Sequence, residues 1–210
     1  MADLFGIPQI TNYLTRMGLK MAHVDDEREV VELAFHGNHG QWRMIVGFQQ
    51  RDEARKLMLI APHIGTVTTI RRLECLEALM SVNYHIAVGK FGIDLDDGEV
   101  RLEEAVPLGS HTIPFEQFQL VFGALMQTVA MYHSLLPRIV YGNLSAVEAL
   151  TICEQEFRQQ AEQESAGDVQ TEPLGDISQE VTVEGEMAQI EIDLNDVMTE
   201  VARIFEEKKE

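Results

Sequence analysis

The sequence predicts an α+β fold in which helices pack against an antiparallel five-stranded sheet, followed by a C-terminal helix on a linker. Short runs rich in Val, Ile, Leu and aromatic residues are separated by turn residues, which is typical of antiparallel strands. Two longer segments, 70–80 and 114–136, repeat apolar residues at helical spacing. The residues after position 160 are strongly acidic instead. These three observations indicate one α+β domain with an appendage.

The first expected element is a helix over residues 7–19, because its apolar side chains recur at helical spacing and Gly18 supplies a stop. Three strands are then expected over 29–35, 42–48 and 56–61, separated by the turn sequences GNHG and RDEAR. Connections this short join neighbouring antiparallel strands, so the three strands form a meander.

A second helix follows the third strand, with Thr68 or Thr69 as its N-cap. We expect its apolar residues to form the buried face and its charged residues the exposed face. The expected buried face consists of Ile70, Leu73, Leu76, Ala78, Leu79 and Met80. Two further strands flank Asp96, Asp97 and Gly98, because Asp-Gly is a hairpin signature.

The segment from Pro114 to Leu136 forms the helix around which the rest is organised, and Pro137 interrupts it. Seven apolar side chains recur there at spacings of three and four and therefore share one stripe: Phe115, Phe118, Phe122, Leu125, Val129, Tyr132 and Leu136. At roughly 2 kcal/mol for each side chain, leaving the stripe in water would forgo about 14 kcal/mol, so it must be buried. A second apolar row consists of Leu120, Ala124, Met131 and Leu135. It indicates that another helix or a second subunit covers a further side.

Ser145 and Glu148 have the spacing of a capping box and begin a further helix. Beyond the apolar part of this helix the sequence becomes polar and rich in small residues, which is typical of a disordered linker. We therefore expect an α+β domain over residues 1–160, an acidic flexible linker over 161–186 and an amphipathic segment over 187–210. The apolar face of the last segment, expected to contact its own domain or a partner, is Val197, Met198, Val201, Ile204 and Phe205.

The charge distribution narrows the classes of partner. The net charge is −19, of which residues 161–210 contribute −12 and residues 1–160 contribute −7. Phosphate contacts need clustered Lys and Arg, so we expect no nucleic-acid binding. The long apolar helix carries several Gln residues and lacks basic flanks, which argues against membrane insertion. With no secretory signal in MADLFGIPQI, we expect a cytoplasmic protein, and Cys75 and Cys153 are predicted to be buried thiols.

No motif predicts catalysis, a metal or a cofactor. His36 and His39 lack the third and fourth ligands of a usual metal site. Asp94, Asp96 and Asp97 resemble part of a calcium loop, but the glycine that follows comes one place early, so we interpret them as a hairpin turn. A nucleophile elbow is also missing from the sequence. We therefore expect no catalytic, metal-binding or cofactor-binding residues.

The predicted order of elements is that of secretion-chaperone-like α+β folds, and the chain resembles the YbjN family of bacterial proteins, which shares that fold. The resemblance rests on LMLIAPHIG (57–65), on 73–94, on the strand 99–108 and on TIPFEQFQLVFGALMQTV (112–129). It covers about residues 5–160, so the acidic C-terminal extension falls outside it. The resemblance implies a small dimeric domain that holds client segments, in a family of stress-response or motility regulators without catalytic residues.

We predict a non-catalytic protein-binding module, a dimeric chaperone, adaptor or assembly factor, because the chain has more apolar surface than a lone five-stranded fold can bury. The candidate dimer or client contacts are Phe115, Phe118, Phe122, Leu125, Val129, Trp42 and Phe48. One alternative is a stress-response regulator that senses a small ligand between sheet and helix. Another is an enzyme whose polar groups come together only in the fold.

Overall fold

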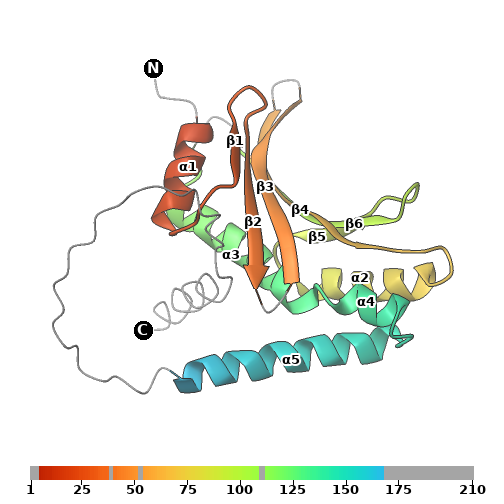
Figure 1. Ribbon diagram of the computed structural model, residues 1–210. Helices are drawn as coiled ribbons and strands as arrows, with labels where there is room; N and C mark the ends of the chain where they lie inside the picture. Colours follow the sequence, from red (N-terminus) through yellow and green to blue (C-terminus); the bar gives the residue numbers. More distant parts are fainter. Residues whose placement is uncertain (1–4, 38–39, 52–53, 109–111, 168–210) are drawn as a thin grey trace, which may run out of the picture.

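The computed structural model describes residues 5–37, 40–51, 54–108 and 112–167. Its helices and strands confirm the α+β class (Figure 1). In chain order the elements are α1 (Ile7–Arg16), β1 (His23–Asp25), β2 (Val30–Gly37), β3 (Gly40–Arg51), β4 (Ala54–Thr66), α2 (Arg72–His85), β5 (Lys90–Ile93), β6 (Glu99–Pro107), α3 (Phe115–Tyr132), α4 (Leu135–Val140) and α5 (Ala146–Gly167).

The sheet has six strands in the order β1-β2-β3-β4-β6-β5, and all neighbouring pairs are antiparallel. The prediction of an antiparallel sheet was therefore correct, and the number of five strands was wrong. The missed strand is β1, which pairs its three residues with the start of β2 through His23–Glu32 and Asp25–Val30. Three residues are too few for an alternating pattern to stand out in the sequence.

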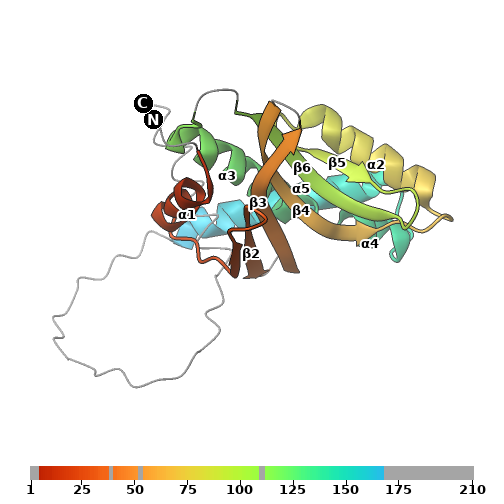
Figure 2. The ribbon, with the colours of Figure 1, turned by 90° about the horizontal axis from the view of Figure 1, so that it is seen from above.

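The helices gather on one side of the curved sheet and leave the other side open (Figures 1 and 2). Alternate strand residues such as Leu33, Met44 and Leu59 point into this helical side and are fully buried. Their neighbours Ile45 and Ile60, which pair across β3 and β4, lie on the opposite side and are only partly buried. We call this opposite side the open sheet face. The core therefore lies between one sheet face and the helices.

The central helix is buried as the sequence predicts, although it divides into α3 and α4. The stripe residues from Phe118 to Leu136 are buried, and Phe115 at its start is half-buried. α3 ends at Tyr132, and Pro137 lies in the first turn of α4, where proline is tolerated. The span Phe115–Val140 is long and apolar enough to cross a membrane by length and composition, but 61% of its 18-residue window of mean hydropathy 1.2 is buried.

α5 packs against the outer side of α3 and α4 and also touches α2 (Figure 1). It begins with the predicted capping box, in which Ser145 N–H donates to Glu148 Oε2 at 2.9 Å and Glu148 N–H donates to Ser145 Oγ at 3.3 Å. The helix continues to Gly167, past the predicted domain boundary at residue 160. The rest of the predicted linker and the whole 187–210 segment lie outside the described residues.

The predicted hairpin at Asp94, Asp96 and Asp97 is confirmed between β5 and β6. Asp94 Oδ1 accepts the N–H of Asp96 at 2.9 Å, and Asp97 Oδ1 accepts the N–H of Glu99 at 2.8 Å. Gly98 has a φ of +78°, and a Cβ there would come within 2.3 Å of the Val67 carbonyl oxygen. These two carboxylates therefore hold the turn together, and the turn requires its glycine.

Candidate protein-binding surface

Most of the predicted contact residues lie inside the chain's own core. Phe118, Phe122, Leu125 and Val129 on α3 have no exposed surface. Trp42 on β3 is buried as well, with its ring stacked on Phe35 at a centroid distance of 4.5 Å. In this fold, these five side chains stabilise the subunit and are not on its surface.

Phe115 and Phe48 remain partly exposed, and both join an aromatic cluster around α1. The ring centroid of Tyr13 lies 5.3 Å from that of Phe115 and 5.8 Å from that of Phe5, and Phe5 lies 6.0 Å from Phe48. The guanidinium of Arg16 covers Phe115 at 3.7 Å. The guanidinium of Arg55 covers Phe48 at 4.0 Å. Because cations already cover these rings, little of their faces is free for a partner.

Four of the exposed large apolar side chains lie together on α2 and in the turn before it. Ile70 in the preceding turn, Leu73, Met80 and Tyr84 are 88%, 67%, 63% and 86% exposed. Leu73, Glu77, Met80 and Tyr84 follow each other at spacings of three and four and form one exposed stripe of α2, and Ile70 precedes it in the turn. We call these five residues the α2 stripe. The prediction that Ile70, Leu73 and Met80 are buried was therefore wrong.

The buried side of α2 is formed by Cys75, Ala78, Leu79 and Val82. Two apolar sets with helical spacing coexist on this helix, and periodicity alone does not say which of them faces the core. Tertiary contacts at both ends of α2 determine which set is buried. At the start of the helix, Arg71 donates to Asn143 Oδ1 at 2.8 Å and to the Leu144 carbonyl at 2.7 Å. Near its end, Asn83 bonds to the backbone of Phe91 on β5.

An apolar groove adjoins the C-terminal end of the α2 stripe. The ring of Tyr84 meets that of His85 edge to face at 5.2 Å, and His85 lines the groove. The cavity has a volume of about 330 Å³ and lies between α3 and the α2–β5 connection. Its lining includes Ile86, Val88, Ala124, Met131 and Tyr132. We call it the α2–α3 groove. The stripe and groove together offer a partner a longer apolar surface than either alone.

The edge strands β1 and β5 are poor sites for an added strand. At one edge β1 has only three residues. At the other edge, Asn83 Oδ1 accepts the N–H of Phe91 at 2.7 Å, and Asn83 Nδ2 donates to its carbonyl at 3.0 Å. The side chain thus occupies backbone groups that an incoming strand would need. A partner therefore has more to gain from the helical surface.

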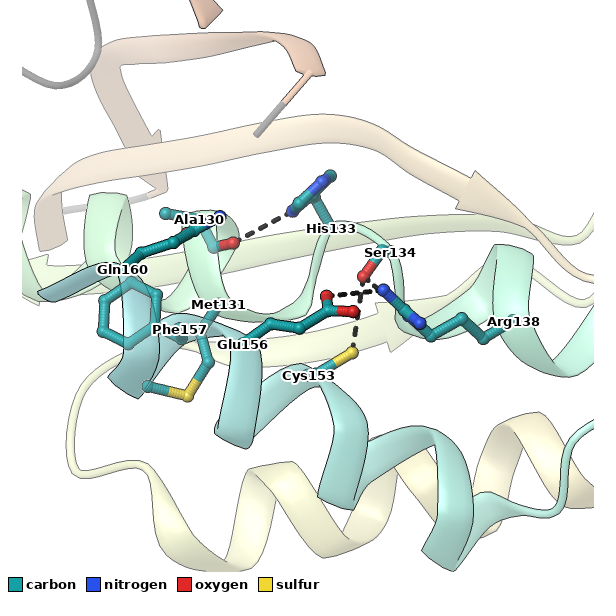
Figure 3. Close-up of a pocket in the computed structure, with 9 residues that line it drawn as sticks. All are labelled: Ala130, Met131, His133, Ser134, Arg138, Cys153, Glu156, Phe157 and Gln160. Atoms are coloured by element: carbon teal, nitrogen blue, oxygen red, sulfur yellow. Dashed lines mark hydrogen bonds and ion pairs between the residues drawn. The ribbon is translucent and has the colours of Figure 1, made fainter. Parts of the chain in front are cut away.

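A second, more polar cavity of about 190 Å³ lies where α3 and α4 meet α5 (Figure 3). Arg138 Nε donates to Ser134 Oγ at 3.1 Å, and Ser134 Oγ lies 3.4 Å from Cys153 Sγ. The His133 ring instead bonds to the Ala130 carbonyl (Figure 3). This cluster contains a thiol, a hydroxyl and a cation, so it is the place in the described structure that most resembles a reaction centre.

The thiol chemistry does not support a nucleophile there. Burial raises the pKa of the Cys153 thiol, although Ser134 and Arg138 act in the opposite direction. Burial likewise raises the pKa of Cys75. Both cysteines are free and buried, as the sequence predicts, and at neutral pH they are thiols and not thiolates. Within residues 5–167, apart from the short undescribed turns, no group of three His, Cys, Asp or Glu side chains could hold a metal ion.

Comparisons with known proteins concern both family and fold. A crystal structure of "YbjN, a putative transcription regulator from E. coli" aligns with a TM-score of 0.43 and 13% identity, covering 65% of this chain and 93% of that one. The crystal structure of the ExsC–ExsE complex aligns with a TM-score of 0.44 and 19% identity, covering 63% of this chain and 97% of that one. Among curated proteins, none matches the chain.

The sequence profile of the YbjN family, described as "Putative bacterial sensory transduction regulator", matches residues 7–136. The matched region runs from the start of α1 into α4 and includes the whole sheet and the α2 stripe. More than half of the chain is covered. The chain therefore belongs to the YbjN family.

Proposed function

We propose that this protein is a non-catalytic protein-binding module, acting as a chaperone, adaptor or assembly factor in the cytoplasm. The observation that carries the proposal is the α2 stripe, four large apolar side chains held in water on one helix face. Fully burying such a side chain contributes about 1.5–3 kcal/mol, so a partner that covers the stripe gains a useful part of a binding free energy. The partner fits as an apolar helix laid along α2 and into the α2–α3 groove.

The homodimer is a second part of the proposal, and we assign it to the open sheet face. Ile45, Met58 and Ile60 supply partly exposed apolar area there. Charges of both signs surround them, with Arg43 beside Glu32 at 3.9 Å and Arg101 beside Glu103 at 2.9 Å. A face that carries both signs can pair with its own copy by setting Glu against Arg.

The test compares partner capture by matched full-length variants in the native host. Leu73→Glu combined with Met80→Glu places two charges on the α2 stripe. Gln155→Glu combined with Gln159→Glu adds the same charge on an exposed part of α5. We expect the stripe variant to lose at least tenfold of any partner that the unaltered chain and the α5 variant capture equally, since tenfold corresponds to about 1.4 kcal/mol. Equal capture by all three proteins would refute the proposed surface.

A regulator that senses a small ligand is the alternative function, and the α2–α3 groove favours it. Its apolar lining from Ile86, Val88 and Met131, with the Thr128 hydroxyl as a polar group, is of a kind that holds small molecules. Native mass spectrometry of protein purified from its host would detect such a ligand as an added mass. A chain without any adduct would remove the support for this alternative.

A further inference from the structure

We propose that the C-terminal segment 194–208 of the same chain binds along the α2 stripe and covers it until a client displaces it. This inference rests on the proposed function, because it concerns the regulation of the same surface. It joins two apolar stripes: the α2 stripe, which is exposed in the described structure, and the apolar pattern in the sequence of the tail. The tail lies outside the described residues, so its part of the argument comes from the sequence.

The two stripes match in length. The helical part of the α2 stripe extends from Leu73 to Tyr84, which is about 17 Å at 1.5 Å for each residue. In the tail, apolar residues recur at the helical spacings of one face: Leu194, Val197, Met198, Val201, Ile204 and Phe205. From Leu194 to Phe205 this pattern spans twelve residues, the same number as Leu73–Tyr84, so the helix that the sequence predicts for the tail can cover the helical part of the stripe.

The tether is long enough for the tail to reach α2. α5 ends at Gly167, which leaves residues 168–193 between it and the segment. A flexible chain of that length has an average end-to-end distance of about 30 Å, and a compact domain of about 160 residues has a radius of gyration of about 15 Å. Binding within one chain therefore needs no stretching of the tether.

Charge favours the tail over a second copy as the occupant. Glu77 lies in the middle of the α2 stripe. If two copies packed α2 against α2 about a twofold axis with their apolar residues overlapping, the two Glu77 carboxylates would meet in an apolar contact, which is costly. The tail instead carries Lys208, four residues from Ile204 and seven from Val201, and hence a basic residue on its own stripe. The tail thus brings a positive charge to one end of the contact, where a second copy of α2 would bring another Glu77.

Because the tail is tethered to the domain, even a weak contact is sufficient to keep the α2 stripe covered. A segment tethered in this way has an effective concentration of about 1 mM, so an unlinked dissociation constant of about 0.1 mM leaves the stripe covered roughly ten times as often as free. The linker and the domain both carry net negative charge, with −12 in residues 161–210 and −7 in 1–160. Their repulsion is screened by salt, so we expect the covered form to increase with ionic strength.

Oxidation of Met80 by hydrogen peroxide, followed by peptide mass spectrometry, tests the inference in the full-length chain. Met80 is 63% exposed on α2 and lies in the proposed contact. We expect slow oxidation in the unaltered chain and about tenfold faster oxidation in Val201→Asp, because the charge disrupts the tail's apolar face. Thr199→Asp is the matched control, since it adds the same charge on the opposite side of the predicted helix and should leave Met80 protected.

Two results would overturn the inference. One is a Met80 that reacts as fast in the unaltered chain as in Val201→Asp. The other is protection that disappears on dilution and is insensitive to Val201→Asp, which would identify another copy as the occupant. Neither result bears on partner capture by the α2 stripe, which the Leu73→Glu and Met80→Glu pair tests separately. Conversely, if the Leu73→Glu and Met80→Glu pair captured partners normally, the proposed partner surface would be refuted. The oxidation result would still report whether the tail covers Met80.

Discussion

The side-chain amide of Asn83 brackets the backbone of Phe91, accepting its N–H at 2.7 Å and donating to its carbonyl at 3.0 Å. One residue of α2 thus both sets the rotation of its helix and closes an edge of the sheet. The contact therefore explains why the apolar residues of the α2 stripe face water and why a partner strand gains little at β5.

Replacing Asn83 with Ala should destabilise the fold and uncover the edge of β5. Two hydrogen bonds to partly buried backbone groups are lost, so we expect the free energy of unfolding to fall by about 1–3 kcal/mol. Urea denaturation measures the loss, and light scattering reports the association expected of an open edge. Asn12→Ala on the exposed side of α1 is the control. An unchanged unfolding midpoint for Asn83→Ala would show that the bracket does not hold α2.

The orientation of α2 predicts unequal costs for similar substitutions on its two sides. Leu79→Ala removes a buried side chain and should cost about 2–5 kcal/mol, because it leaves a cavity. Leu73→Ala removes an exposed one and should stay within about 0.5 kcal/mol. Chemical denaturation of both variants measures the change in the free energy of unfolding. A cost of several kcal/mol for Leu73→Ala as well would support the buried face that the sequence predicts, which includes both residues.

The contribution of α3 to the core can be tested at Phe118 and Phe115. Phe118 is fully buried, so Phe118→Ala should lower the free energy of unfolding by about 3–5 kcal/mol. Phe115 is half-buried beneath Arg16, and Phe115→Ala should cost clearly less. Thermal unfolding ranks the two variants. If both were tolerated, α3 would not be the centre of the core.

The capping box of α5 should respond to acid. Hydrogen bonds from Ser145 favour the ionised carboxylate and lower the pKa of Glu148 below its ordinary value of 4.5. The unfolded chain therefore takes up this proton first as the pH falls, so the stabilisation is complete above pH 4.5 and disappears as the pH falls through the lowered pKa. An NMR titration of Glu148 should show the lowered value, and in Ser145→Ala the ordinary one. Identical titrations in both proteins would contradict the capping role.

The proposed dimer can be tested on the open sheet face. Ile60→Lys puts a charge at its apolar centre, where Ile60 pairs with Ile45 on β3 and Glu103 on β6. Gln155→Lys on α5 adds the same charge at an exposed position away from that face. Sedimentation velocity should show weaker association only for Ile60→Lys. A dimer unaffected by Ile60→Lys would have to use another surface, and a chain that is monomeric throughout would refute the dimer itself.

The sequence by itself determined the α+β class, the meander, the buried stripe of α3, the Asp-Gly hairpin and the capping box at Ser145. Each of these follows from the spacing of nearby apolar residues or from local turn and cap residues, and such local patterns largely determine secondary structure. The segments that carry the family resemblance all lie within residues 7–136, which the family profile matches.

Only the tertiary structure decided which side of α2 is buried, because Ile70, Leu73 and Met80 satisfy helical periodicity as well as Cys75, Leu79 and Val82 do. The choice depends on Asn83 and Arg71 reaching residues far along the chain or in another element. The candidate partner contacts that the sequence placed on α3 lie in the core, whereas exposed apolar side chains lie on α2. Burial is a property of what packs against a helix, and a helix's own sequence does not contain its neighbours.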